Sequence, residues 1–215
     1  MNKLITALIV CSVMCGFSQG KREHYVLPEF TEGVLLDKNG ELSKGKVNYN
    51  ALVEAVVLKE DGKYVPLRND LARNADTLYV GKRKFVNRSG KFYELLFDSD
   101  TDLFVEYYCV LKSSTEDRSA YGSSSQTGTA VVQRQVFNQN IFYDLELPEL
   151  YTAELKYRYF IVTSKGEITI ESLRDIKKKY SRLKKKYSNY KKDNKVNIKD
   201  PQSIAKLVEY LESNK

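Results

Sequence analysis

Nucleophilic chemistry has few candidate residues in this chain, because its 215 residues include three cysteines and a single histidine. Cys109 lies in the run from Leu103 to Lys112, where apolar and polar residues alternate as in a half-buried strand. A thiol in apolar surroundings has a raised pKa and is unreactive. His24, the one candidate base, is close to the start of the expected mature chain, where chains are loosely ordered. We therefore expect no Cys109–His24 pair and no catalytic residue of this type.

Aspartates and serines supply two partial motifs. Asp98, Asp100 and Asp102 have the spacing of the first half of a calcium-binding loop, whose carboxylates gather around one cation. Leu103 stands where this loop needs glycine, so we predict a turn between two strands. The run Gly122–Ser125 is similar to a hydrolase nucleophile elbow, but the glutamine that follows breaks the G-x-S-x-G spacing. The sequence thus predicts no metal ligand and no cofactor.

The positive charge of the chain is concentrated in one segment. Of its 35 Lys and Arg, 13 lie in residues 165–199 with four of the 28 Asp and Glu, which gives this segment a net charge of +9. Such density is typical of a surface that binds anions, and an exported protein meets anionic lipid head groups or acidic glycans rather than nucleic acid. The alternative is a solvated helix face that confers solubility. The predicted anion-binding surface consists of Lys177, Lys178, Lys184, Lys185 and Lys186.

The first 18 residues have the features of a secretory signal peptide. Lys3 gives a positive start, the run from Leu4 to Cys15 carries no charge, and small residues precede a cleavage site between Ser18 and Gln19. The apolar run is shorter than the roughly 20 residues needed to span a bilayer, so we expect no transmembrane segment in the mature chain. The expected localisation is the periplasm or the outer membrane.

A lipoprotein signal is the alternative, since Cys11 and Cys15 both lie in this segment. Neither cysteine has both the leucine three residues before it and the small residue immediately before it that such a signal normally has. Simple cleavage leaves Cys109 as the last cysteine, which excludes an intramolecular disulfide in the mature chain. A hydrophobic core must then stabilise the domain, and about 200 residues are enough to build one.

From Thr31 to Ile170 short apolar or alternating runs are separated by turn residues, which favours antiparallel strands. The run from Leu103 to Lys112 is the clearest of about eight to ten strands, and its odd-numbered residues share one face. We predict an α+β fold, mainly β, built as an antiparallel sandwich or a partly open barrel with two C-terminal helices. Residues 19–170 form the β domain, with a flexible loop rich in Ser, Gly and Thr at 113–129. The predicted turns are Asp37–Gly40, Asp61–Gly62, Ser89–Gly90 and Lys165–Gly166.

Towards the C-terminus, apolar residues recur every three or four positions from Leu173 to Tyr190, which indicates an amphipathic helix. Ser172 and Asp175 form a capping-box pattern at its start. Asp200 followed by proline begins a second helix. An apolar stripe needs a partner, so we predict that residues 171–215 pack on the β domain as a basic helical tail. The buried side of the second helix is expected to consist of Ile204, Leu207, Val208 and Leu211.

The residue patterns of three strand segments are similar to those of other exported proteins; these segments are Gly45–Asn50, Leu78–Phe85 and Phe92–Leu96. The lysine-rich helix and a last helix of the QSIAKLVEYL type are similar as well. In these features, residues 30–112 and 170–212 resemble signal-peptide-bearing proteins of the Bacteroidetes that have no assigned activity. The resemblance implies an envelope location and a non-catalytic role, and it supplies no active-site residue.

The sequence therefore favours a non-catalytic binding or structural module of a periplasmic or outer-membrane assembly, with an envelope protein as partner. One alternative is a periplasmic carrier that holds a lipid-like or other apolar ligand in a β-lined pocket. A second alternative is a hydrolase whose carboxylates, distant in the sequence, converge in the fold. The first two hypotheses differ in whether side chains fill the interior of the β domain or leave a cavity there.

Overall fold

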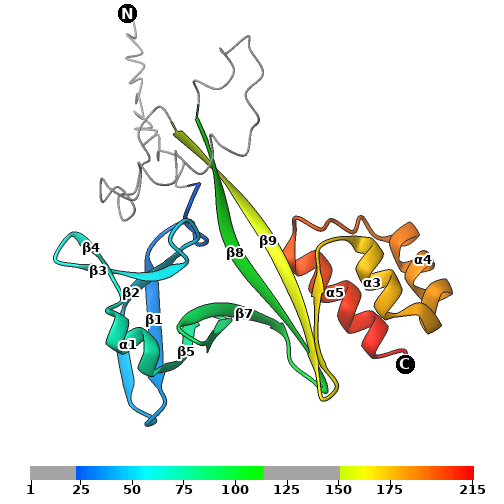
Figure 1. Ribbon diagram of the computed structural model, residues 1–215, viewed down its shortest axis with the longest axis horizontal. Helices are drawn as coiled ribbons and strands as arrows, with labels where there is room; N and C mark the ends of the chain where they lie inside the picture. Colours follow the sequence, from blue (N-terminus) through cyan, green and yellow to red (C-terminus); the bar gives the residue numbers. More distant parts are fainter. Residues whose placement is uncertain (1–22, 114–150) are drawn as a thin grey trace, which may run out of the picture.

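Ten strands form one antiparallel sheet in the described part of the chain, which is residues 23–113 and 151–215 of the computed structural model (Figure 1). The order across the sheet is β10-β9-β8-β7-β6-β5-β1-β2-β3-β4. The predicted α+β, mainly β fold is confirmed. The strands are Thr31–Asp37 (β1), Leu42–Asn50 (β2), Ala55–Glu60 (β3), Lys63–Pro66 (β4), Ala75–Val80 (β5), Arg83–Arg88 (β6), Lys91–Phe97 (β7), Thr101–Ser113 (β8), Tyr151–Thr163 (β9) and Gly166–Ile170 (β10).

Tight turns set most of this topology, and the four predicted turns each join two strands that pair with one another. In the first, the Asp37 carboxylate accepts hydrogen bonds from the backbone N–H groups of Asn39 and Glu41, both at 2.8 Å. Gly40 follows with φ +87°, a conformation that glycine adopts without steric cost. The aspartate-rich run also forms the predicted turn, because residues 98–100 connect the end of β7 at Phe97 to the start of β8 at Thr101.

One connection departs from the simple up-and-down order. After β4 at one edge, the chain returns through the short helix α1 (Asn69–Asn74) and places β5 on the other side of β1. The side-chain amide of Asn87 on β6 holds this return, because it donates to the carbonyl oxygens of Ala72 and Ala75 at 2.5 and 2.8 Å. The first four strands are thereby joined to the other six through the β1–β5 pair.

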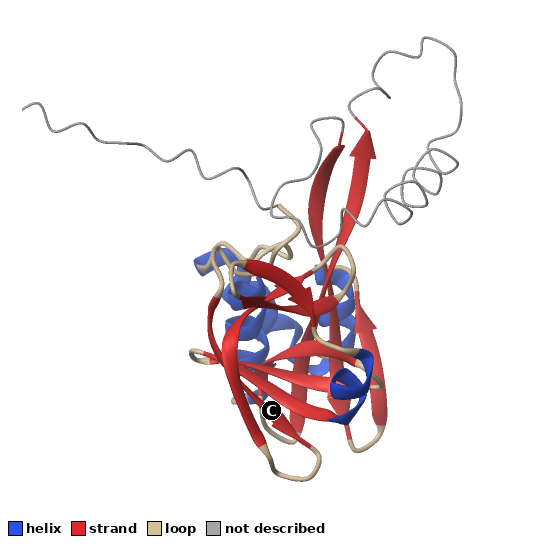
Figure 2. Cartoon of the chain, turned by 90° about the vertical axis from the view of Figure 1, so that its left-hand side faces the viewer, coloured by secondary structure: helices blue, strands red, loops and turns tan. Residues whose placement is uncertain are grey.

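The sheet remains open at β4 and β10, yet it curls strongly (Figure 2). The curl brings the turn after β2 against β8, where the Cys109 N–H donates to the carbonyl oxygen of Ala51 at 2.9 Å. The concave face is the core. The odd-numbered residues of β8, from Leu103 to Leu111, are all buried there as predicted. Tyr49 of β2 and Phe85 of β6 stack across the core with ring centroids 6.2 Å apart.

Two buried tyrosines on this face differ in how their hydroxyls are satisfied. The Tyr49 hydroxyl has no hydrogen-bond partner among the described residues, whereas the Tyr159 hydroxyl donates to the carbonyl oxygen of Ile198 at 2.7 Å. A buried polar group without a partner costs about 1–3 kcal/mol. We expect Tyr49→Phe to raise the free energy of unfolding by about 1 kcal/mol and Tyr159→Phe to lower it by about as much. Urea denaturation of both variants tests this, and shifts of the same sign would contradict it.

The C-terminal segment forms three α-helices that lie behind the strands in Figure 2. They are α3 (Leu173–Lys179), α4 (Lys184–Asp193) and α5 (Pro201–Glu212), and a single turn of 3-10 helix, η3 (Ser181–Leu183), separates the first two. Both predicted starts are confirmed, since Asp175 Oδ2 accepts from the Ser172 N–H at 2.8 Å and Asp200 Oδ1 accepts from the Gln202 N–H at 3.0 Å. Helix α5 packs on β7 and β8. Its fully buried residues include the predicted Ile204, Leu207, Val208 and Leu211.

The first of the two predicted helices is interrupted, and a tertiary contact explains why. The Tyr187 hydroxyl donates to the carbonyl oxygen of Leu173 at 2.9 Å. In one straight helix these residues would lie about 21 Å apart along the axis, at 1.5 Å per residue. The chain therefore leaves the helical conformation at Tyr180, which has φ −98° and ψ 41°, and α4 folds back beside α3.

Candidate functional site

Cys109 is buried, with 7% of its surface exposed, and this confirms its predicted place in a strand. Burial, with smaller contributions from the charges of Glu23 and Glu54, raises the pKa of its thiol to about 12. The thiol is protonated at neutral pH and is a poor nucleophile.

The expectation that His24 lies on a loosely ordered segment is wrong. The side chain is completely buried, and the His24 carbonyl oxygen accepts from the Ala51 N–H at 2.7 Å. The next residues continue along β2, where the Val26 N–H donates to the Tyr49 carbonyl oxygen at 2.9 Å. Asn48 completes the attachment through its amide, which accepts from the Leu27 N–H at 3.0 Å and donates to the Leu27 carbonyl oxygen at 2.9 Å. Backbone pairing with β2 thus holds this segment against the core.

Several predicted features lie outside the described residues. These are the signal peptide with its cleavage between Ser18 and Gln19, the alternative lipid attachment at Cys11 or Cys15, and the serine-rich loop beyond Ser113. Among the helices of residues 23–113 and 151–215, none is long and apolar enough to cross a membrane. The same residues contain no group of three or more His, Cys, Asp or Glu that could hold a metal ion.

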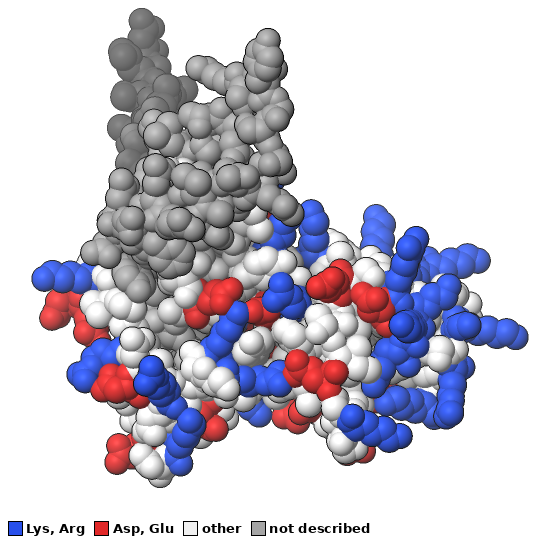
Figure 3. Space-filling view, in the orientation of Figure 1, with Lys and Arg blue, Asp and Glu red and all other residues white. Residues whose placement is uncertain are grey.

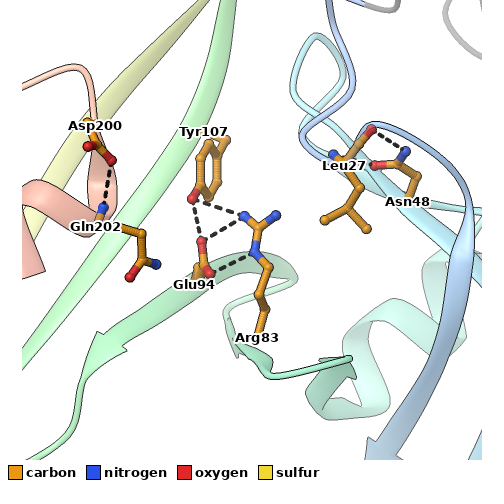
Figure 4. A network of polar contacts seen from close by, with 7 residues as sticks. All are labelled: Leu27, Asn48, Arg83, Glu94, Tyr107, Asp200 and Gln202. Carbon is orange, nitrogen blue, oxygen red and sulfur yellow. Dashed lines mark hydrogen bonds and ion pairs between the residues drawn. The ribbon is translucent and has the colours of Figure 1, made fainter.

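A buried ion pair lies on the concave face between the sheet and the start of α5 (Figure 4). Arg83 on β6 contacts both carboxylate oxygens of Glu94 on β7, at 2.7 and 2.8 Å. Arg83 also donates to the Tyr107 hydroxyl at 3.1 Å, and this hydroxyl in turn donates to Glu94. The Glu94 side chain is 4% exposed, so its charge is compensated almost entirely by these two partners.

The Arg83–Glu94–Tyr107 group borders a cavity of about 340 Å³ whose other walls include Val26, Tyr157 and Gln202. Burial and the charge of Glu94 raise the pKa of Tyr107, which keeps its hydroxyl protonated. The hydrogen bonds of the group join β6, β7 and β8 to one another. The turn at Ser89–Gly90 could have indicated the pair, because its register places Glu94 opposite Phe85 and diagonal to Arg83.

A second charged cluster lies on the convex face. Glu106 of β8 is 3% exposed and accepts from Arg158, its direct partner on β9, at 2.9 Å. Lys91 of β7 contacts the same carboxylate and also pairs with Glu54 at 2.6 Å. These bonds join the turn after β2 to three strands of the sheet, and the two cations neutralise both carboxylates.

A largely apolar space lies elsewhere, between the first five strands and α1. It is a cavity of about 270 Å³ at the concave side of β1–β4. Gly45 helps to keep it empty, since a Cβ atom added there would meet only Leu58 Cδ2, at 3.6 Å. Charged residues of its lining are Lys44, Glu60 and Arg68. Its apolar walls are Leu35, Val47, Val56, Leu58, Val65, Pro66, Leu67, Leu71 and Leu78.

The five lysines of the predicted anion-binding surface are exposed on α3 and α4. Figure 3 shows Lys and Arg gathered over this helical part of the molecule, whereas acidic and basic side chains are mixed over the sheet. Among the described residues none of the five forms an ion pair, and Lys186 donates to the backbone carbonyl oxygen of Asn214 at 3.0 Å. Lys177 and Lys178 lie near the end of α3, and the other three lie at the start of α4, beyond η3.

Comparison of the chain with protein-family models, curated proteins and solved structures gave no match. Its function must therefore be inferred from the described residues.

Proposed function

We propose that the protein is a non-catalytic binding protein that holds a small apolar ligand, or the apolar part of a larger one, in the cavity between β1–β5 and α1. The observation that supports this most directly is the cavity itself, nine of whose fifteen lining residues are aliphatic. A folded domain of this size fills its interior at close to crystal packing density. An apolar space of this volume is therefore an exception within the fold, and apolar cavities are the typical sites of small-molecule binding.

The size and the entrance of the cavity limit the ligand. Its volume of about 270 Å³ is just below the roughly 300–1,000 Å³ that ligand pockets occupy, so the ligand or its bound part must be small. Leu71 of α1, which borders it, is 47% exposed, so apolar surface continues from the cavity to the outside. Lys44 and Arg68 beside it provide a polar boundary. A short acyl chain or an aromatic ring with a polar end matches this arrangement.

The N-terminal pattern supports placing this binding role in the cell envelope, and the proposal needs no enzymatic step. A structural role in an envelope assembly is the second candidate. It is favoured by β9, whose residues 151–158 pair with β8 on one side and with no described strand on the other. Such an edge can accept a strand from another protein.

Filling part of the cavity should weaken binding. We expect Gly45→Val to weaken the binding of an uncharged apolar fluorophore, N-phenylnaphthylamine, by about tenfold or more, which corresponds to about 1.4 kcal/mol, because the new side chain occupies space in the cavity that the ligand needs. The matched control is Lys46→Val, which introduces the same side chain on the opposite, exposed face of β2. Fluorescence titration of the three proteins measures the effect.

Equal affinity in Gly45→Val and the parent protein would overturn the cavity as the binding site. Native mass spectrometry of the protein isolated gently from its host envelope separates the two candidate functions. A retained small molecule that is lost on denaturation supports the binding role, whereas a retained protein partner with an empty cavity supports the assembly role.

A further inference from the structure

A third cavity lies where the β9–β10 turn, the break between α3 and α4, and the end of α5 meet. Its volume is about 500 Å³. We call it the basic hollow and define it by Lys165, Lys179, Arg182 and Lys215, with Tyr180, Ser181 and Leu183 completing its lining. None of its lining residues belongs to the five lysines of the predicted surface.

Four separate segments bring the cations of the basic hollow together. Lys165 comes from the β9–β10 turn, Lys179 is the last residue of α3, and Arg182 lies in η3. Lys215 Nζ pairs with Glu212 at 2.5 Å and lies 5.7 Å from the centre of the Tyr180 ring. The other three cations form no ion pair with any described residue. Since Glu212 offsets Lys215, Lys165, Lys179 and Arg182 leave the hollow with uncompensated positive charge.

The backbone adds to this charge. Helix α4 begins immediately after η3, and neither element has a side chain that caps its first N–H groups. Leu183, the residue immediately before α4, belongs to the lining. The positive end of the α4 dipole favours an anion at this position. Three side-chain cations and a helix start therefore converge on one space.

We propose that the basic hollow binds a phosphate group carried by a small organic molecule or a lipid head group. A phosphate monoester has a charge of about −1.5 to −2 at pH 7 and three strong acceptor oxygens, which a carboxylate does not provide. Arg182 can bind two of these oxygens at once, whereas the lysines bind as point charges. The hollow is larger than one phosphate group needs, and Tyr180 and Leu183 offer apolar contacts to the remainder of the ligand.

Calorimetric titration of the full-length protein with pyrophosphate and with glycerol phosphate tests the site. We expect the double variant Lys179→Gln/Arg182→Gln to bind at least about tenfold more weakly, because each charged hydrogen bond contributes roughly a factor of ten. Lys165→Gln, on a different element, should weaken binding as well. The matched control Lys184→Gln/Lys185→Gln removes the same charge from exposed α4 positions outside the hollow and should change the affinity less than about threefold.

The source of the phosphate is decided with vesicles made of phosphatidylcholine alone or of equal parts of phosphatidylcholine and phosphatidic acid. Binding confined to the soluble esters assigns a soluble ligand. Binding confined to the vesicles with phosphatidic acid assigns a lipid head group, provided that it is lost in Lys179→Gln/Arg182→Gln and kept in the control. The absence of binding to every probe, or an equal loss in the control variant, would overturn the proposal, because the second result describes attraction to the whole basic surface.

Discussion

Glu94→Ala is expected to lower the free energy of unfolding by about 3–5 kcal/mol, the range for removing one partner of a buried ion pair. The carboxylate is 4% exposed and accepts three hydrogen bonds, two from Arg83 and one from Tyr107. Its removal leaves a guanidinium whose side chain is 29% exposed, together with a buried hydroxyl, without their acceptor. Since the total free energy of unfolding of a domain is about 5–15 kcal/mol, this single change removes a large part of the stability. Urea denaturation followed by circular dichroism measures the loss.

The charge of the pair is distinguished from its shape by two further variants. Glu94→Gln keeps the volume and one acceptor oxygen but leaves the Arg83 charge without its counter-charge, so we expect it to remain clearly destabilised. Arg83→Met/Glu94→Gln removes both charges and leaves an acceptor for the Tyr107 hydroxyl. It should recover most of the lost stability, because a buried ion pair contributes little beyond an apolar replacement. A double variant as unstable as Glu94→Ala would show that the geometry of the pair, rather than its unpaired charge, is essential.

The parts of the fold that were predictable from the sequence are those that depend on neighbouring residues. Turns such as Asp37–Gly40 bond within themselves, so the strands beside them pair without any distant information. The return through α1 from β4 to β5 depends instead on Asn87, which is distant in the sequence from the residues it holds. The burial of His24 depends on pairing with β2, a contact that no local pattern indicates.

The interrupted helix shows what the periodic spacing of apolar residues can predict and what it cannot. The apolar stripe from Leu173 to Tyr190 is buried or partly buried as the spacing predicts, because the break at Tyr180 leaves each half in phase with the core. The position of the break depends on the hydrogen bond from the Tyr187 hydroxyl to the Leu173 carbonyl oxygen. This contact cannot be predicted from the spacing of apolar residues. The basic hollow follows from this break, since Lys179 and Arg182 lie on either side of it.

The two cavities proposed as binding sites, the apolar cavity beside Gly45 and the basic hollow, differ in how far the sequence could predict them. The sequence around Gly45 is equally compatible with a filled core and with a pocket lined by aliphatic residues. Which of the two forms depends on how the sheet curls. For the basic hollow, the sequence does indicate a basic tail. It does not indicate that Lys165, in the β9–β10 turn before that tail, and Lys215, at its end, both lie beside Tyr180. Charge density can be counted along a chain, whereas convergence of charge requires the fold.

Leu207→Ala is expected to lower the free energy of unfolding by about 2–5 kcal/mol, because it leaves a cavity under α5 as well as removing apolar contacts. Leu207 is completely buried in the stripe that packs on β7 and β8. The adjacent Lys206 is exposed, so Lys206→Ala serves as the control and should change stability by less than about 0.5 kcal/mol. Thermal and urea unfolding of both variants give the comparison.

The same variant shows whether the helices and the sheet unfold as one unit. Helix α5 contributes Pro201 and Gln202 to the cavity beside Glu94 and holds Tyr180 through the bond from its hydroxyl to Glu212, at 2.5 Å. If these contacts couple the two layers, helical circular dichroism and tyrosine fluorescence should report one shared transition in Leu207→Ala, at a lower urea concentration. A separate, earlier loss of helical signal would instead make the helices an independent unit, and the basic hollow would then open without unfolding of the sheet.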